Sequence, residues 1–185
     1  MPIAFVPFKL VICGLDQINA HCTSDISHIV SILDPGYDKP EALARFAAHE
    51  RIDLRFHDII DEHDQMTAPQ RDDIDRLLQF GRSMLQSPSA INVLIHCHAG
   101  LSRSTAAALL LLMQGQPRQS PETTMTQLLE INPNAWPNLR MIEIGDDLLG
   151  CAGQLVVAVR HHYASLVERY PIIERALSAR RHLRG

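Results

Sequence analysis

The sequence predicts an α/β domain built on a central, mostly parallel sheet flanked by helices. In the first half of the 185-residue chain, short apolar segments that favour strands alternate with segments of helical periodicity. This alternation is typical of parallel strands joined by right-handed helical crossovers. The second half contains helical patterns only, which predicts that these helices cover one face of the sheet. Hydrophobic residues make up 46% of the chain and charged residues 21%, as expected for a globular domain with a sizeable core.

Four segments are predicted to form strands. Residues 9–13 are short and apolar, and residues 28–33 are rich in branched apolar side chains. The second segment is followed by Asp34, a proline and a glycine, which predicts a sharp stop. Residues 51–60 alternate in part between apolar and polar side chains, and residues 91–95 form an apolar run typical of a buried strand.

Helical signals occupy most of the remaining chain. A weak signal covers residues 17–22 and another covers residues 40–49, whereas residues 61–67 are polar and predict a loop. Ser120 is suited to cap a helix in which Pro121 takes the first position. The other predicted helices cover residues 69–85, 103–114, 120–131, 137–150 and 153–170.

Charge and cysteine content limit the functional classes. Residues 1–170 are expected to form a single domain, followed by a C-terminal tail, 171–185, that is basic at its end. The net charge of −4 predicts no general attraction to nucleic acid or to a membrane, and no signal peptide or long uncharged apolar run is evident. The cysteines are scattered without close metal-ligand pairs, which predicts a reducing, cytoplasmic location and no structural metal. They are Cys13, Cys22, Cys97 and Cys151.

The most informative stretch is residues 96–104, His-Cys-His-Ala-Gly-Leu-Ser-Arg-Ser. Cys97 is followed six positions later by Arg103, with Gly100 between them and Ser104 directly after. An apolar run precedes this stretch and an alanine- and leucine-rich run follows it. The layout therefore predicts a buried strand, a tight loop and a helix that begins at Arg103.

This layout suits a bound phosphate. A helix N-terminus offers free N–H groups and a positive dipole end, and successive N–H groups around Gly100 can form a concave anion site. Arg103 can donate two parallel N–H bonds to phosphate oxygens. The same positive environment favours a thiolate at Cys97, and Ser104 can hydrogen-bond the sulfur. One loop thus combines a nucleophile with a phosphate-binding site.

The stretch resembles the Cys-x5-Arg-Ser/Thr signature of the cysteine-dependent protein tyrosine phosphatases. With His96 and the Ala99-Gly100 pair it is most similar to the dual-specificity branch, and the compact chain looks similar to small bacterial members. The resemblance implies the tyrosine-phosphatase fold, with the loop at the carboxyl end of a central strand. It also implies a phosphocysteine intermediate on Cys97, without metal or cofactor. The residues that it implies for substrate binding are His98, Ala99, Gly100, Leu101, Ser102 and Arg103.

The chemistry also needs a general acid that protonates the leaving oxygen. In the family this is an aspartate on a mobile loop after a strand, and residues 57–64 occupy that place. Superposing the family's Pro-Ile/Val-x-Asp pattern puts Asp58 at the proline position and Asp61 at the acid. Asp61 is therefore the first candidate, Asp58 is a close rival because it directly ends the strand, and Asp64 is third.

Two further features follow from the resemblance. Residues 132–139, Asn-Pro-Asn-Ala-Trp-Pro-Asn-Leu, resemble the Pro-Asn segment that supports the site in the family. His96 occupies the position that orients the loop and stabilises the thiolate. The sole tryptophan, Trp136, is predicted to serve packing rather than substrate contact.

The sequence therefore predicts a phosphoprotein phosphatase, of tyrosine or dual specificity, that acts on a phosphorylated protein or a small phosphomonoester. Relatives directed at phosphoinositides carry lysines inside the loop, where this chain has His98 and Leu101, so an inositide preference is disfavoured. The alternative is a catalytically weak module that binds phosphate or phosphoproteins. The lack of a Cys-x-x-Cys pair argues against a redox protein.

Overall fold

The computed structural model describes residues 8–22, 25–87 and 89–169. The predicted basic tail, residues 171–185, lies outside these ranges, so the domain boundary at residue 170 stays a prediction. No helix within the described ranges is long and apolar enough to cross a membrane.

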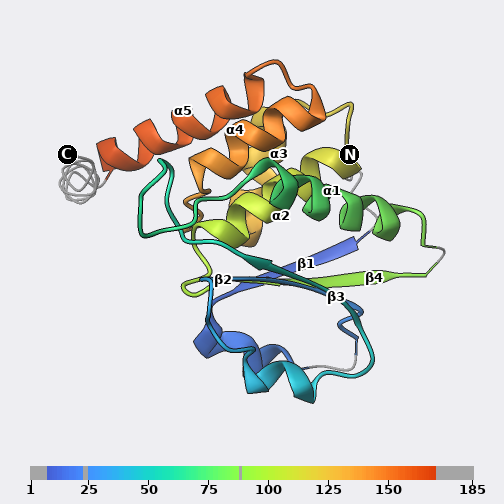
Figure 1. Ribbon diagram of the computed structural model, residues 1–185. Helices are drawn as coiled ribbons and strands as arrows, with labels where there is room; N and C mark the ends of the chain where they lie inside the picture. The colour runs from blue at the N-terminus through green and yellow to red at the C-terminus, as the bar shows by residue number, and fades with distance from the viewer. Residues whose placement is uncertain (1–7, 23–24, 88, 170–185) are drawn as a thin grey trace.

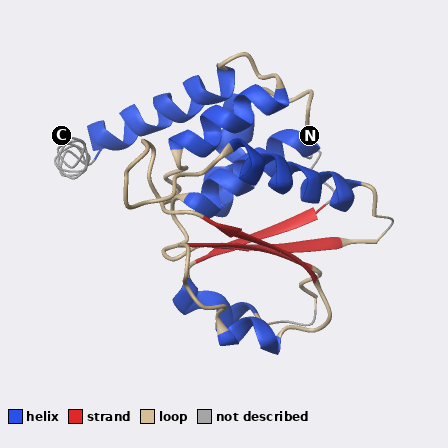
Figure 2. Ribbon diagram, in the orientation of Figure 1, coloured by secondary structure: helices blue, strands red, loops and turns tan. Residues whose placement is uncertain are grey.

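Within the described residues the sheet consists of four parallel strands: β1 (Phe8–Cys13), β2 (His28–Leu33), β3 (Glu50–Arg55) and β4 (Ile91–His96). Their order across the sheet is β1-β4-β2-β3 (Figures 1 and 2). The prediction of a central parallel sheet flanked by helices is confirmed. β4 lies between β1 and β2, which explains why its sequence is an almost continuous apolar run.

The carboxyl ends of three strands meet at one edge of the sheet. Cys13, at the end of β1, and Ser31 of β2 both lie opposite His96, the last residue of β4. Open parallel sheets bind their ligands at this edge. The loop that begins with Cys97 therefore leaves the sheet at the position where a ligand site is expected.

The two faces of the sheet are covered differently. Two short 3₁₀ helices, η1 (Leu15–His21) and η2 (Glu41–Arg45), lie on one face, and the long helices gather on the other (Figures 1 and 2). The helix-rich second half therefore covers one face, as predicted. The long helices are α1 (Arg71–Leu85), α2 (Arg103–Gly115), α3 (Pro121–Ile131), α4 (Leu139–Leu149) and α5 (Gln154–Arg169).

Helix α2 is the centre of the helical layer. Every one of its residues from Arg103 to Met113 is buried, because α2 packs on β4 and β1 and is itself covered by α1, α3 and α4. Three alanines followed by four leucines give it small and large apolar side chains on all sides. Such a helix is held firmly by close packing, so its N-terminus has a fixed place at the edge of the sheet.

Two predicted boundaries are wrong. The helix expected over residues 40–49 is only the short 3₁₀ helix η2, Glu41–Arg45, and the backbone is extended at Phe46. The strand expected to continue to residue 60 ends at Arg55, because β2, its only partner among the described strands, ends at Leu33, the residue opposite Arg55. A strand at the edge of a sheet has no other neighbour to extend its ladder.

Candidate active site

The loop between β4 and α2 is folded tightly against the end of β1. Gly100 has a φ of +73°, and a Cβ at this position would lie 2.6 Å from the backbone of both Cys13 and Gly14. Only glycine accepts both that backbone conformation and that close approach. The N–H of Leu15 donates to the carbonyl of His98 at 3.0 Å, which ties the loop to the same segment.

Cys97 is the first residue of this loop, and its side chain points into it. Cys97 is only 2% exposed. Its Sγ lies 3.2 Å from the N–H of Gly100, which donates to it, and 3.2 Å from the hydroxyl of Ser104. Both contacts can stabilise negative charge on sulfur, so the structure brings Cys97 and Ser104 together as the sequence predicted.

Arg103 begins α2 and is 3% exposed. Its Nη1 donates to Oδ1 of Asp34 and to the carbonyl of Phe56, both at 2.6 Å. Its Nε is buried and has no hydrogen-bond partner among the described residues. A buried N–H without a partner is costly, and a ligand oxygen in the loop would satisfy it.

Two other buried side chains at this edge carry no charge at neutral pH. Burial lowers the pKa of His96 to about 4, although the Cys97 backbone opposes this effect. His96 is therefore neutral and does not stabilise a thiolate as a cation. Burial, followed by the charges of Cys97 and Asp16, raises the pKa of Cys13 to about 12. Cys13 is thus a protonated thiol.

Asp58 contacts the loop directly. Its Oδ1 accepts hydrogen bonds from the hydroxyl of Ser102 at 2.6 Å and from Nδ2 of Asn138 at 2.9 Å. Asp58 lies in the connection between β3 and α1, residues 56–70. Asp61 and Asp64 lie further along this connection, and both are exposed. The bond to Ser102 joins Asp58 directly to the loop between β4 and α2.

The connection that carries these aspartates is fastened to helix α4. Asn138, which is buried and caps α4, also donates to the carbonyl of Ile59 at 3.2 Å. Arg140 of α4 donates to the carbonyls of Pro69 and Ile60 and pairs with Glu62. These contacts hold the connection between β3 and α1 against the start of α4.

The segment predicted to support the site does so through its backbone and its asparagines. Nδ2 of Asn132 donates to the carbonyl of Gly100 at 3.0 Å, and the N–H of Trp136 donates to the carbonyl of Leu101 at 2.8 Å. The Trp136 ring stacks on Tyr163 of α5, with centroids 4.3 Å apart and planes 6° from parallel. Trp136 therefore serves packing, as predicted, and α5 supports the loop from behind.

Sequence reasoning missed two residues at the site. Asp34, read only as part of a turn, holds Arg103, and its backbone N–H donates to Nε2 of His98 at 3.3 Å. Tyr37 packs edge-on against the His98 ring with centroids 4.7 Å apart. The available signal was positional, because Asp34 follows a strand whose carboxyl end lies at the same edge as the loop.

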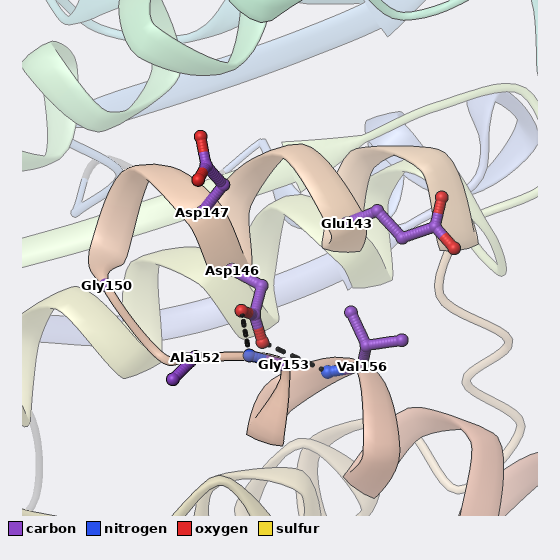
Figure 3. Close-up of a pocket in the computed structure, with 7 residues that line it drawn as sticks. All are labelled: Glu143, Asp146, Asp147, Gly150, Ala152, Gly153 and Val156. Carbon is purple, nitrogen blue, oxygen red and sulfur yellow. Dashed lines mark hydrogen bonds between the residues drawn. The ribbon is translucent and has the colours of Figure 1, made fainter.

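A pocket of about 450 Å³ lies between α4 and α5, away from the loop (Figure 3). Its buried carboxylate, Asp146, accepts hydrogen bonds from the N–H groups of Gly153 at 2.6 Å and Val156 at 3.3 Å (Figure 3). It also accepts one from the N–H of Leu155 at 2.8 Å. Asp146 thus caps the start of α5 and has its hydrogen bonds within the protein. We regard this pocket as structural.

No protein-family model matches this sequence, and a search of curated proteins found no match. Solved structures do match its fold. The active form of Tk-PTP has a TM-score of 0.56 at 18% sequence identity, covering 79% of this chain and 95% of that chain. The PTP-2 phosphatase of Cydia pomonella gives a TM-score of 0.59 at 17% identity, covering 75% and 84%. Human DUSP28 gives 0.57 at 12% identity, covering 81% and 97%.

These similarities confirm the tyrosine-phosphatase-like fold that the signature loop predicted. At identities of 12 to 18% they establish the architecture, and they leave the chemistry to be argued from the residues of this chain.

Proposed function

We propose that the chain is a cysteine-dependent phosphatase that hydrolyses phosphomonoesters of proteins through a phosphocysteine on Cys97. The observation that carries this proposal is the state of Arg103. Its buried guanidinium is fixed on one side by Asp34 and Phe56, while its Nε lacks a partner next to a loop that holds a cysteine. A phosphate in the loop would supply that partner.

In the first step, the sulfur of Cys97 attacks phosphorus, so that a P–S bond forms as the ester P–O bond breaks. The loop N–H groups and Arg103 bind the phosphoryl oxygens, where negative charge must be stabilised. The leaving oxygen takes a proton from a carboxylic acid. We assign this role to Asp58, the second candidate from sequence, since its carboxylate already contacts the loop through Ser102.

In the second step, water attacks the phosphocysteine and the P–S bond breaks. The carboxylate left on Asp58 accepts the proton from this water, which restores the acid. Sulfur leaves as a thiolate, and the Ser104 hydroxyl, 3.2 Å from Sγ, can stabilise it by donating a hydrogen bond. Inorganic phosphate is the product.

Apolar side chains near the loop suit a phosphorylated protein side chain better than a highly charged sugar phosphate. Leu101, within the loop, and Tyr37, beside His98, are both large and exposed. No residue of the loop between Cys97 and Arg103 is a lysine. We therefore propose phosphotyrosine or phosphoserine and phosphothreonine in proteins as the substrate class.

The test is hydrolysis of an aryl phosphate in EDTA, with wild type and Cys97→Ser compared from pH 5 to 8. Metal-independent activity that disappears in the variant supports the proposal. If the wild type shows no turnover but binds vanadate, the chain is instead a phosphate-binding module, the alternative that the sequence left open.

A further inference from the structure

Asp34 joins two residues of the signature loop although it comes from a different strand end. It is the first residue after β2. Its Oδ1 accepts from Nη1 of Arg103 at 2.6 Å, and its Oδ2 lies 3.5 Å from Nε2 of His98. Its own N–H donates to the same Nε2 at 3.3 Å. Both the backbone and the side chain of Asp34 therefore contact residues of the signature stretch, His98 and Arg103.

We propose that Asp34 is a positioning residue that sets the orientation of the Arg103 guanidinium for phosphate; this inference rests on the proposed function. An arginine side chain has five N–H donors in a rigid plane. The two on Nη1 are engaged by Asp34 and by the carbonyl of Phe56. The opposite edge, Nε and Nη2, has no hydrogen bond within the described residues. That edge forms the two parallel bonds of a bidentate phosphate contact.

Two fixed points on Nη1 leave the guanidinium plane little freedom. The Phe56 carbonyl alone would allow rotation about one hydrogen bond, and the Asp34 carboxylate removes that rotation. Arg103 is also 3% exposed, so water cannot replace the lost acceptor easily. The unpartnered edge is therefore held toward the loop before any ligand arrives.

The charge of Asp34 has an opposing effect, because a carboxylate near the site repels a phosphate dianion. The Asp34 side chain is 39% exposed, however, so solvent screens this repulsion. The short hydrogen bond to a buried guanidinium is not screened in the same way. Orientation should therefore outweigh repulsion, and removing Asp34 should weaken anion binding.

Vanadate binding and the kcat/KM for an aryl phosphate test this proposal in Asp34→Ala, Asp34→Asn and the matched control Asp38→Ala. Asp38 is an exposed carboxylate that lies, like Asp34, between β2 and η2, and its removal changes the net charge equally. We expect Asp34→Ala to raise the vanadate Kd about tenfold, as for the loss of one charge-assisted hydrogen bond. Asp34→Asn should lose less, because its amide oxygen still accepts from Nη1, and the control should match wild type.

A double-mutant cycle with Arg103→Lys asks whether Asp34 acts through Arg103. A lysine cannot form the planar fork, so adding Asp34→Ala to Arg103→Lys should cause no further loss of vanadate affinity. An equal loss in both backgrounds would overturn the proposal. So would tighter vanadate binding by Asp34→Ala, which indicates repulsion, or a lower melting temperature with an unchanged Kd, which indicates a structural role.

The outcomes also separate this inference from the proposed function. In one outcome, the wild type hydrolyses aryl phosphate and binds vanadate, and Asp34→Ala and Asp34→Asn have the same vanadate Kd and kcat/KM as the wild type. That result refutes only the role of Asp34. If the wild type neither binds vanadate nor hydrolyses aryl phosphate, the proposed function fails and the role of Asp34 fails with it.

Discussion

Replacing Asp58 by asparagine should remove the general acid while leaving the site assembled. The Asp58 Oδ1 accepts from Ser102 and Asn138, and an asparagine side chain can accept the same two hydrogen bonds through its amide oxygen. Both bonds become neutral rather than charge-assisted, and Asp58 is exposed. The free energy of unfolding should therefore change by about 1 kcal/mol or less.

The catalytic effect should be much larger and should depend on the leaving group. A positioned acid contributes roughly 100- to 10,000-fold to the rate of a step in which it transfers a proton. A p-nitrophenolate ion is a weak base and leaves without a proton, whereas phenolate needs one. Asp58→Asn should thus reduce kcat/KM for phenyl phosphate by roughly that factor, and for p-nitrophenyl phosphate by much less.

The assay is the ratio of kcat/KM for these two substrates in wild type, Asp58→Asn and Asp61→Asn. Asp61 is the matched control, because it is an exposed aspartate on the same connection and was the first candidate from sequence. We expect the ratio to change only in Asp58→Asn. A change confined to Asp61→Asn would refute the argument from geometry and return the acid to Asp61.

Three other predictions follow from the site. Gly100→Ala should destabilise the fold by more than the roughly 1–2 kcal/mol of left-handed backbone strain, because its Cβ would overlap the β1 backbone; urea denaturation should show a smaller loss for Gly36→Ala, which also has positive φ but open space. Cys97→Ser should abolish turnover and still bind vanadate in a titration, whereas Arg103→Ala should lose both; strong vanadate binding by Arg103→Ala would contradict the phosphate contact. The pKa of about 4 for His96 lies below its unfolded value, so its stabilising contribution is full above pH 6.5 and should be lost as the pH falls toward 4, by about 3 kcal/mol in denaturation curves. His96→Asn should flatten that pH dependence, and an unchanged slope would assign it to other groups.

The order of elements and the signature loop could be predicted because both depend on local patterns. The buried run of β4, the glycine turn and the alanine-leucine helix are each specified by neighbouring residues. The end of β3 could not be predicted, because it depends on the length of β2, the one strand that pairs with it in the described part of the chain. Apolar residues continue past Arg55, so the pattern alone extends the strand to residue 60.

The ranking of the candidate acids came from the family's Pro-Ile/Val-x-Asp pattern, which places the acid at Asp61 when it is superposed on residues 58–61. That pattern does not show which side chain the fold turns toward the loop. β3 ends at Arg55, and in the chain that follows it Asp58 accepts a hydrogen bond from Ser102. Asp34 was missed for a related reason, since its contact with Arg103 depends on the register of β2 against β4.

The hydrogen bonds around the loop explain how it can be ready for an anion before one binds. The carbonyls of His98, Gly100 and Leu101 each accept a hydrogen bond from outside the loop. Because a peptide unit is planar and trans, a carbonyl turned outward places the following N–H on the opposite side. The three donors come from two segments that are distant from the loop in the chain: Leu15 follows β1, and Asn132 and Trp136 lie within residues 132–139. Nine residues of sequence therefore identify the proposed anion site, but the whole fold is needed to orient its N–H groups inward. In the proposed reaction these groups would require no rearrangement as charge develops on the phosphoryl oxygens.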